Sequence, residues 1–233
     1  MSARLQPGTR RAIAEAFAKL DYRALGPIYC HEGGDAFWKS KRRLCQRLGS
    51  ALAARLRRRL KRKGRSLYVG AGVAEIPALS METVERDRQV VVFNLRAAEV
   101  RILNQACAGL PLRFETRNAA TVRGIFDHLW LVSVLNDPEC YPELSDLSYG
   151  RANPATFDPR RFARERRDML QVLDRCLRSL ARPGLVTTST EEAHWIADWC
   201  TARKIPWHVE RGRYPSPTVG DPICFMRIGE KGK

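Results

Sequence analysis

The sequence predicts an α/β fold in which helices cover both faces of a mostly parallel sheet of seven strands. Three observations support this prediction. From residue 66 onward, short apolar segments alternate with segments of helical periodicity. Several of the apolar segments are nearly continuous, as expected for strands buried on both faces. The last two strand candidates follow each other without a helix between them, which predicts a closing antiparallel hairpin.

The boundaries of these elements follow from apolar runs and from helix start and stop residues. Asp158 and Pro159 form a strong helix start, as an N-cap residue followed by proline. Pro183-Gly184 predicts the end of that helix. The helices are expected at 74–85, 96–108, 159–181 and 190–204. The strands are expected at 66–69, 89–94, 112–116, 127–135, 184–189, 207–210 and 223–228.

A helical extension is predicted to precede this sheet. Residues 9–20 contain good helix formers with apolar residues at helical spacing, and Gly26-Pro27 indicates a loop. A long helix is expected from about Asp35 to a stop at Gly64, with a stripe of leucines at every fourth position. The leucines are Leu44, Leu48, Leu52, Leu56 and Leu60. We therefore predict an extension over 1–64 and a second domain over 65–233.

Composition places the chain among globular proteins that bury a core. Apolar residues make up 44% of it, and no apolar run is long enough to span a membrane. The N-terminus has no apolar segment of the secretory type. The seven cysteines are scattered, which is typical of reduced thiols. These features predict a cytoplasmic protein.

The net charge of +16 is concentrated in one block. Residues 39–65 hold 13 of the 41 Lys and Arg residues, and residues 36–74 contain no acidic residue. The block could be a solvated helix face, a phosphate-contacting surface, or a surface for anionic membranes. The missing acids favour contact with the phosphates of RNA or another polyanion. The predicted contacts are Arg55, Arg57, Arg58, Arg59, Lys61, Arg62 and Lys63.

The most informative segment is a glycine-containing junction between a strand and a helix. An apolar run ends in Gly70-Ala71-Gly72, and glycines there allow a ligand to approach the backbone closely. A tight turn without a ligand is the simplest alternative. A dinucleotide is less favoured, because Glu75 stands where that motif needs a small residue. The expected acid about 20 residues on is also missing.

Four segments together resemble class I S-adenosylmethionine-dependent methyltransferases, which have a Rossmann-like fold. Residues 67–72 resemble the first glycine motif, and residues 90–94 the second strand of that family. Residues 126–135 resemble the fourth strand, and residues 177–184 the junction before the fifth. The resemblance extends over roughly residues 60–230.

The resemblance implies a set of residues around S-adenosylmethionine. Gly70, Ala71 and Gly72 would line its methionine part, Asn94 would face the ribose and Asn118 would lie near the adenine. The adjoining Tyr68, Leu95 and Ala119 belong to the same predicted site, and Ser133 would border the transferred methyl group. Two usual acids are replaced, by Tyr68 and by Asn94. An amide is a weaker acceptor of ribose hydroxyls than a carboxylate.

Candidate catalytic residues lie in the long connection over 136–158, which follows the fourth strand. They are Asn136, Asp137 and Tyr141, with Asp146 and Tyr149 further along. For Asp137, a turn-forming role before proline is at least as well supported. No metal is predicted, because His31 beside Cys30 lacks further ligands at defined spacing.

The sequence thus favours a methyltransferase that acts on an unidentified acceptor, either RNA or a small molecule. One alternative is a non-catalytic protein of the same fold that binds nucleic acid through the basic helix. Another is a transferase that moves a different group from the same cofactor.

Overall fold

The chain forms an α/β fold with a seven-stranded sheet, which confirms the predicted fold class. The structure is a computed structural model that describes residues 4–30, 34–216 and 220–230. The strand order is β3-β2-β1-β4-β5-β7-β6, and β7 runs antiparallel to β5 and β6. The strands are β1 (Arg65–Val69), β2 (Gln89–Asn94), β3 (Phe114–Thr116), β4 (Phe126–Leu131), β5 (Leu180–Ser189), β6 (Trp207–Val209) and β7 (Ile223–Ile228).

The chain divides into two compact units, and each is described by itself. Unit 1 comprises residues 1–118 and 214–220, and unit 2 comprises residues 119–213 and 221–233. The boundary expected from the sequence, at residue 64, falls inside unit 1. None of the described helices is both long enough and apolar enough to cross a bilayer.

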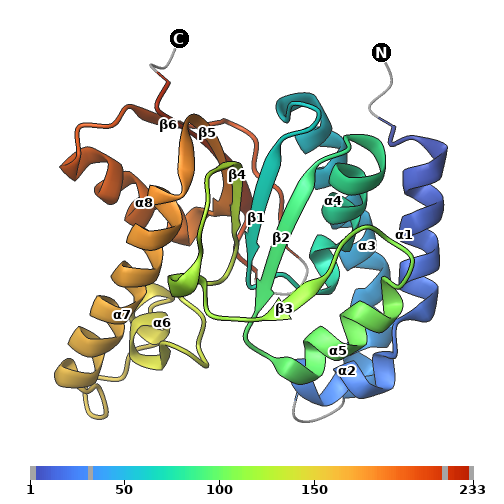
Figure 1. The fold of residues 1–233 in the computed structure, drawn as a ribbon. Helices are drawn as coiled ribbons and strands as arrows, with labels where there is room; N and C mark the ends of the chain where they lie inside the picture. The colour runs from blue at the N-terminus through green and yellow to red at the C-terminus, as the bar shows by residue number, and fades with distance from the viewer. Residues whose placement is uncertain (1–3, 31–33, 217–219, 231–233) are drawn as a thin grey trace. The chain divides into compact units, whose positions relative to one another are not determined.

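Among the described residues of unit 1, five helices lie to one side of three parallel strands (Figure 1). The helices are α1 (Pro7–Lys19), α2 (Tyr22–Tyr29), α3 (Gly34–Arg59), α4 (Ile76–Ser80) and α5 (Ala97–Ala106). α1 packs on α4 and α5, and α3 packs on α2 and α4. The leucine stripe of α3 is buried at Leu52 and Leu56, whereas Leu44 is exposed. A 3-10 turn (Val73–Glu75) and a π-helical turn (Met81–Glu85) extend α4 at its two ends.

Unit 2 contains β4, β5, β7 and β6 with three helices (Figure 1). The helices are α6 (Pro142–Ser148), α7 (Pro159–Arg178) and α8 (Thr190–Ala202). The predicted start of α7 is confirmed, because the Asp158 side chain accepts from the backbone N–H groups of Arg160 and Arg161. α7 packs on α6 and β5, and α8 packs on β5, β6 and β7.

Two predicted helix features were wrong in the extension. Gly26-Pro27 lies inside α2 rather than in a loop, because Asp21 caps this helix and Gly26 lies directly against the backbone of Gly34. α3 ends at Arg59 and not near Gly64. The carbonyl groups of Leu60 and Lys61 accept hydrogen bonds from the Arg86 and Arg88 guanidinium groups, so they do not continue the helix.

Three predictions in unit 2 also need correction. The fourth strand ends at Leu131 and not at residue 135, because Ser133 has a left-handed backbone with φ 57° and the following N–H groups turn toward Glu192. The connection over 136–158 contains the short helix α6, which the sequence analysis described only as a loop. Pro183-Gly184 lies within β5, since α7 already ends at Arg178.

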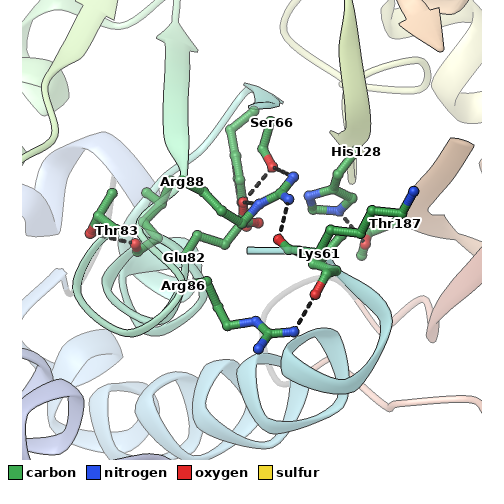
Figure 2. A network of polar contacts seen from close by, with 11 residues as sticks. Lys61, Ser66, Glu82, Thr83, Arg86, Arg88, His128 and Thr187 are labelled. Atoms are coloured by element: carbon green, nitrogen blue, oxygen red, sulfur yellow. Dashed lines mark hydrogen bonds and ion pairs between the residues drawn. The ribbon is translucent and has the colours of Figure 1, made fainter. Parts of the chain in front are cut away.

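A buried polar cluster joins β1 to the helical segment that follows it (Figure 2). Glu82 is fully buried, and its carboxylate lies 2.8 Å from Arg88 Nε and 2.7 Å from the Tyr68 hydroxyl. Ser66 donates to the same carboxylate and accepts from Arg88 Nη2 at 2.9 Å. Arg88 Nη1 donates to the carbonyl of Lys61 at 2.7 Å. We call Ser66, Tyr68, Glu82 and Arg88 the clamp.

The clamp determines how the chain leaves β1. Ser66 and Tyr68 are two residues apart and therefore point to the same face of the strand, toward Glu82. Burial, followed by the Glu82 carboxylate, raises the pKa of Tyr68 well above its ordinary value. The Tyr68 hydroxyl therefore remains a proton donor. The strand and the helical segment are held together on both sides of Gly70–Gly72.

Removing one member of the clamp should leave an uncompensated buried charge. We expect Arg88→Met to lower the free energy of unfolding by about 3–5 kcal/mol, measured by urea denaturation. Arg178→Met is the control, since Arg178 pairs with Asp174 at 2.7 Å but its side chain is 63% exposed. That change should cost less than about 1 kcal/mol. Equal losses in the two variants would contradict a structural role for the clamp.

Candidate functional site

The junction after β1 is shaped by two glycines with different roles. Gly70 is exposed and adopts φ 69°, a left-handed conformation that L-residues rarely take. Gly72 is buried, and a Cβ on it would lie 2.6 Å from the Tyr29 hydroxyl and 2.7 Å from Glu99 Oε1. Its N–H donates to Glu75 Oε2 at 2.8 Å. The junction thus lies directly against polar side chains from α2 and α5.

Glu99, in the first turn of α5, is the central acceptor beside this junction. Its carboxylate is 1% exposed and accepts from the Tyr29 hydroxyl and, at 3.1 Å, from Asn94 Nδ2. Arg96 Nη1 lies 3.8 Å from Glu99 Oε2. Sequence reasoning missed both Glu99 and Tyr29. An acid in the first turn of a helix that directly follows a strand was the available signal for Glu99.

Asn94, which was predicted to face a ribose, is engaged within the protein. Its Nδ2 donates to Ala71 O at 2.9 Å and to Glu99, and its Oδ1 accepts from Arg96 N at 2.8 Å. Asn94 is 6% exposed. It therefore joins the glycine junction to α5 and orients the Glu99 carboxylate.

The other residues of this region that were predicted to bind the cofactor differ in burial and in their contacts. Tyr68 is completely buried in the clamp, and its hydroxyl is directed to Glu82. Ala71 is buried, whereas Leu95 is 55% exposed and Asn118 is exposed. Ala119 is buried at the start of a 3-10 turn in unit 2. A cofactor role for each of them stays a prediction. For Tyr68, that role competes with an observed structural contact.

The electrostatic character of the junction is acidic. Glu75 accepts a hydrogen bond from the N–H of Gly72. A carboxylate oxygen of Glu99 lies close to the position that a Cβ on Gly72 would take. The pKa of Tyr29 is raised well above its ordinary value, first by burial and then by Glu99 and Glu75. The N–H of Gly72, which could have received an anion, is already bonded to Glu75. The junction therefore disfavours phosphate groups and favours hydroxyl donors and cations.

The segment after β4 is organised by another buried glutamate, Glu192. Its carboxylate accepts from the backbone N–H groups of Ser133, Val134 and Leu135 at 2.9, 2.5 and 2.6 Å. The hydroxyl of Ser189 lies 3.2 Å from the same carboxylate, and the N–H of Glu192 returns to that hydroxyl at 3.3 Å. Burial raises the pKa of Glu192, and the backbone hydrogen bonds act in the opposite direction. The pattern Ser189-x-x-Glu192 has the sequence signature of a capping box, a signal that was available, and the Ser189 side chain caps α8 by accepting from Glu192 N.

Two side chains after β4 retain polar atoms without a partner among the described residues. These atoms are Ser133 Oγ and Asn136 Oδ1, both buried. Asn136 Nδ2 donates to the Tyr149 hydroxyl at 2.8 Å. A buried acceptor without a donor is costly, and such atoms often mark places that meet a ligand or water.

The other two predicted catalytic residues have local contacts. Asp137 Oδ1 accepts from the N–H groups of Glu139 and Cys140, both at 2.9 Å, which is the turn-forming arrangement weighed in the sequence. Tyr141 is the N-cap residue of α6 and is half-buried, and burial raises its pKa to about 12. Tyr149, a candidate from further along the same connection, also has a pKa raised to about 12, first by burial and then by Asp221 and Glu192.

Some of the predicted basic contacts are paired with groups of the protein, and others are exposed to solvent. Arg57 forms an ion pair with Glu85, and Arg62 donates to Glu85 O at 3.3 Å. Arg59 donates to Arg55 O at 2.9 Å, within α3. Arg55, Arg58, Lys61 and Lys63 are exposed, and the last two lie beyond the end of α3. Nucleic-acid binding by this set stays a prediction.

Basic residues also line a groove between α1 and α3. Its volume is about 610 Å³, and Arg4, Arg10 and Arg55 line it together with Gln46 and Ser50. None of the described lining residues is acidic.

Among the described residues, no group of three or more His, Cys, Asp or Glu side chains is arranged to hold a metal ion. His31, which was considered in the sequence analysis, lies outside the described residues.

No family model matches the sequence, and no curated protein matches it. Solved structures do match. Magnesium protoporphyrin IX methyltransferase from Synechocystis PCC 6803, solved with bound SAM, aligns at a TM-score of 0.54 and 13% identity. That alignment covers 97% of this chain and 99% of the other.

An N-methyltransferase from Bradyrhizobium japonicum aligns at a TM-score of 0.51 and 10% identity, over 81% of this chain and 97% of that chain. A methyltransferase homolog from Pyrococcus horikoshii aligns at 0.50 and 12% identity, over 77% and 65%. The chain therefore has the fold of class I S-adenosylmethionine-dependent methyltransferases.

The segment after β4 should depend on Glu192. In Glu192→Ala, the buried N–H group of Leu135 and the part-buried N–H groups of Ser133 and Val134 lose their acceptor. We expect faster hydrogen exchange at Ser133, Val134 and Leu135 and a loss of about 2 kcal/mol or more in the free energy of unfolding. Glu191→Ala, in the same helical turn, is the control and should leave these three amides protected. Unchanged exchange in Glu192→Ala would show that other contacts hold the segment.

Proposed function

We propose that this chain is an S-adenosylmethionine-dependent methyltransferase whose unit 1 binds the cofactor at the Gly70–Gly72 junction. The fold likeness to methyltransferases, one of them solved with bound SAM, supports the cofactor class. The residues at the junction support the proposal independently of that likeness.

The observation that carries the proposal is the pair of glutamates at Gly72. A dinucleotide would bring a pyrophosphate to this turn, and two carboxylates would repel it. S-adenosylmethionine has no phosphate, and it carries a sulfonium cation, an ammonium group and two ribose hydroxyls. Those groups match the carboxylates of Glu75 and Glu99, which lie 3.8 Å and 2.7 Å from a Cβ placed on Gly72. The residues thus fit this cofactor better than they fit a phosphate-bearing one.

The cofactor supplies an electrophilic methyl group, which is transferred with departure of a neutral thioether. The chain has to orient that group and exclude water around it. Gly70 lets the backbone turn out of β1, and the clamp keeps this turn in one conformation. Binding also requires the Tyr29 hydroxyl to leave its position against Gly72.

Within unit 2, we assign Ser133 and Asn136 to acceptor binding, because each has a buried polar atom without a partner among the described residues. Tyr141 and Tyr149 remain protonated near neutral pH, because their pKa values are raised to about 12. Neither tyrosine can then serve as a phenolate base. This favours an acceptor that attacks with a free lone pair and loses its proton afterwards.

We further propose RNA as the acceptor class, on the evidence of the groove between α1 and α3. Three arginines without an acidic neighbour among the lining residues suit a phosphate backbone. Arg55 belongs both to this groove and to the basic block of the sequence. A small-molecule acceptor would not require the groove.

Calorimetric titration tests the cofactor proposal. We expect S-adenosylmethionine and S-adenosylhomocysteine to bind with micromolar dissociation constants, and NADH to show no binding. Gly72→Arg should abolish binding, because even a Cβ there meets Tyr29 and Glu99 within 2.7 Å. Gly8→Arg is the control, since the nearest atom to a Cβ on Gly8 is 4.0 Å away. Absence of binding to the wild-type protein at millimolar ligand would refute the proposal.

Charge reversal in the groove tests the RNA proposal. We expect Arg10→Glu combined with Arg55→Glu to weaken RNA binding and to lower the salt slope by about one for each lost phosphate contact. Arg43→Glu combined with Arg47→Glu is the matched control, because both residues are exposed on α3 and neither lines the groove. RNA affinities measured from 50 to 200 mM salt should distinguish the two pairs. Equal weakening would indicate only a general charge effect.

A further inference from the structure

Among the described partners of the Glu99 carboxylate, one differs in kind from the others. Asn94 and Arg96 come from the same strand end and helix start as Glu99 itself. Tyr29 comes from α2, in the extension that precedes the sheet, and its hydroxyl donates to Glu99 Oε1. This hydroxyl is also the atom that a Cβ on Gly72 would meet first, at 2.6 Å. A hydroxyl donor from outside the sheet therefore occupies the space next to the glycine junction.

Tyr29 is held at this position by aromatic packing and by a helix crossing. Its ring lies 4.9 Å from that of Trp38 in an edge-on arrangement and 5.9 Å from that of Phe37. α2 meets α3 where Gly26 and Gly34 lie in direct backbone contact, so close that a Cβ on Gly34 would be 2.4 Å from Gly26 C. The position of Tyr29 is therefore set by α2 as a whole.

We propose that Glu99 is the residue that receives the ribose hydroxyls of the cofactor, and that Tyr29 competes with the cofactor for this carboxylate. The inference rests on the cofactor proposed above and deepens it. It assigns the role of the acid usually found at the end of the second strand to an acid in the first turn of α5.

Asn94 cannot fill that role in its observed position. Both hydrogens of its Nδ2 are used, by Ala71 and by Glu99, and its Oδ1 accepts from Arg96 N. Glu99 can exchange one hydroxyl donor for another without disturbing Asn94. A carboxylate that already accepts from a phenol hydroxyl has the chemistry needed for a sugar hydroxyl, and such charge-assisted bonds are about twice as strong as neutral ones.

The exchange should be feasible because the packing around Tyr29 contains an unmet polar group. Trp38 Nε1 is buried and has no hydrogen-bond partner among the described residues. An unsatisfied buried donor raises the free energy of this arrangement and lowers the cost of leaving it. Burial and the nearby carboxylates also raise the pKa of Tyr29, so its hydroxyl keeps the proton that it donates.

The test compares S-adenosylhomocysteine with its 2′,3′-dideoxy analogue by calorimetry on the full-length chain. The wild-type protein should prefer the hydroxyl-bearing ligand by about tenfold or more, as expected for bonds to a charged acceptor. In Glu99→Gln this preference should fall to about threefold or less. Glu75→Gln is the comparison, because Glu75 is the other acid at Gly72: it should weaken the binding of both ligands alike and keep the preference.

A substitution of Tyr29 provides an independent test of the proposal. Tyr29→Phe removes only the competing hydroxyl and should tighten S-adenosylhomocysteine binding by about tenfold. Tyr22→Phe is the matched control, because Tyr22 is also in α2 and lies 5.6 Å from Trp38, but its hydroxyl donates to Phe17 O. Unchanged affinity in Tyr29→Phe would refute the proposal that Tyr29 competes with the cofactor for Glu99. This measurement tests the proposal even if Glu99→Gln fails to fold.

The outcomes separate the two proposals. Binding with an undiminished hydroxyl preference in Glu99→Gln would overturn the role of Glu99 and leave the cofactor assignment standing. Failure of both wild type and Tyr29→Phe to bind either nucleoside would refute the cofactor assignment itself, and this inference with it.

Discussion

The buried contact between Glu82 and Arg88 is the constraint on which the glycine junction depends. It brings a charged pair into a fully buried position, where each charge is costly unless its partners are in place. Ser66 and Tyr68 supply those partners from β1, so the strand cannot shift relative to the helical segment that carries Glu82. The distance that the junction between them has to bridge is therefore fixed. Gly70 allows the chain to bridge it by adopting a left-handed backbone conformation. The shape of the candidate site is thus a consequence of polar contacts made by residues that precede and follow the junction in the chain.

The contacts of Tyr68 and Asn94 account for two departures from the pattern of the methyltransferases that the sequence resembles. A tyrosine at position 68 completes the coordination of Glu82, a task that an acid could not perform beside a carboxylate. An asparagine at position 94 can donate to Ala71 and Glu99 while accepting from Arg96 N, whereas a carboxylate could only accept. The two replacements are therefore consistent with each other. With Tyr68 and Asn94 in the strands, the acidic groups of the candidate site are Glu75 and Glu99, which lie in the helical segments that follow β1 and β2.

Much of the fold could be predicted from the sequence, because strand and helix periods are local properties. The bounds of β2 and β7 match the prediction, and the closing hairpin followed from the missing helix before β7. Helix ends were predicted less well, since the end of α3 depends on Arg86 and Arg88, which lie more than 20 residues further along the chain. The glycine junction carried a local signal, but the approach of Tyr29 to Gly72 did not, because it arises from the crossing of α2 and α3.

Both units place a first-turn glutamate near the end of a strand, where the helix dipole favours a negative charge. The two carboxylates differ in what holds them. Glu192 is surrounded by backbone N–H groups of one short segment, which cannot leave without unfolding that segment. Among the described residues, the α2 side chain that donates to Glu99 is Tyr29, and we propose that a ligand hydroxyl can replace it. A buried carboxylate becomes a binding group only when one of its donors can be exchanged. By that criterion Glu192 is structural, and Glu99 is the acid available to a ligand.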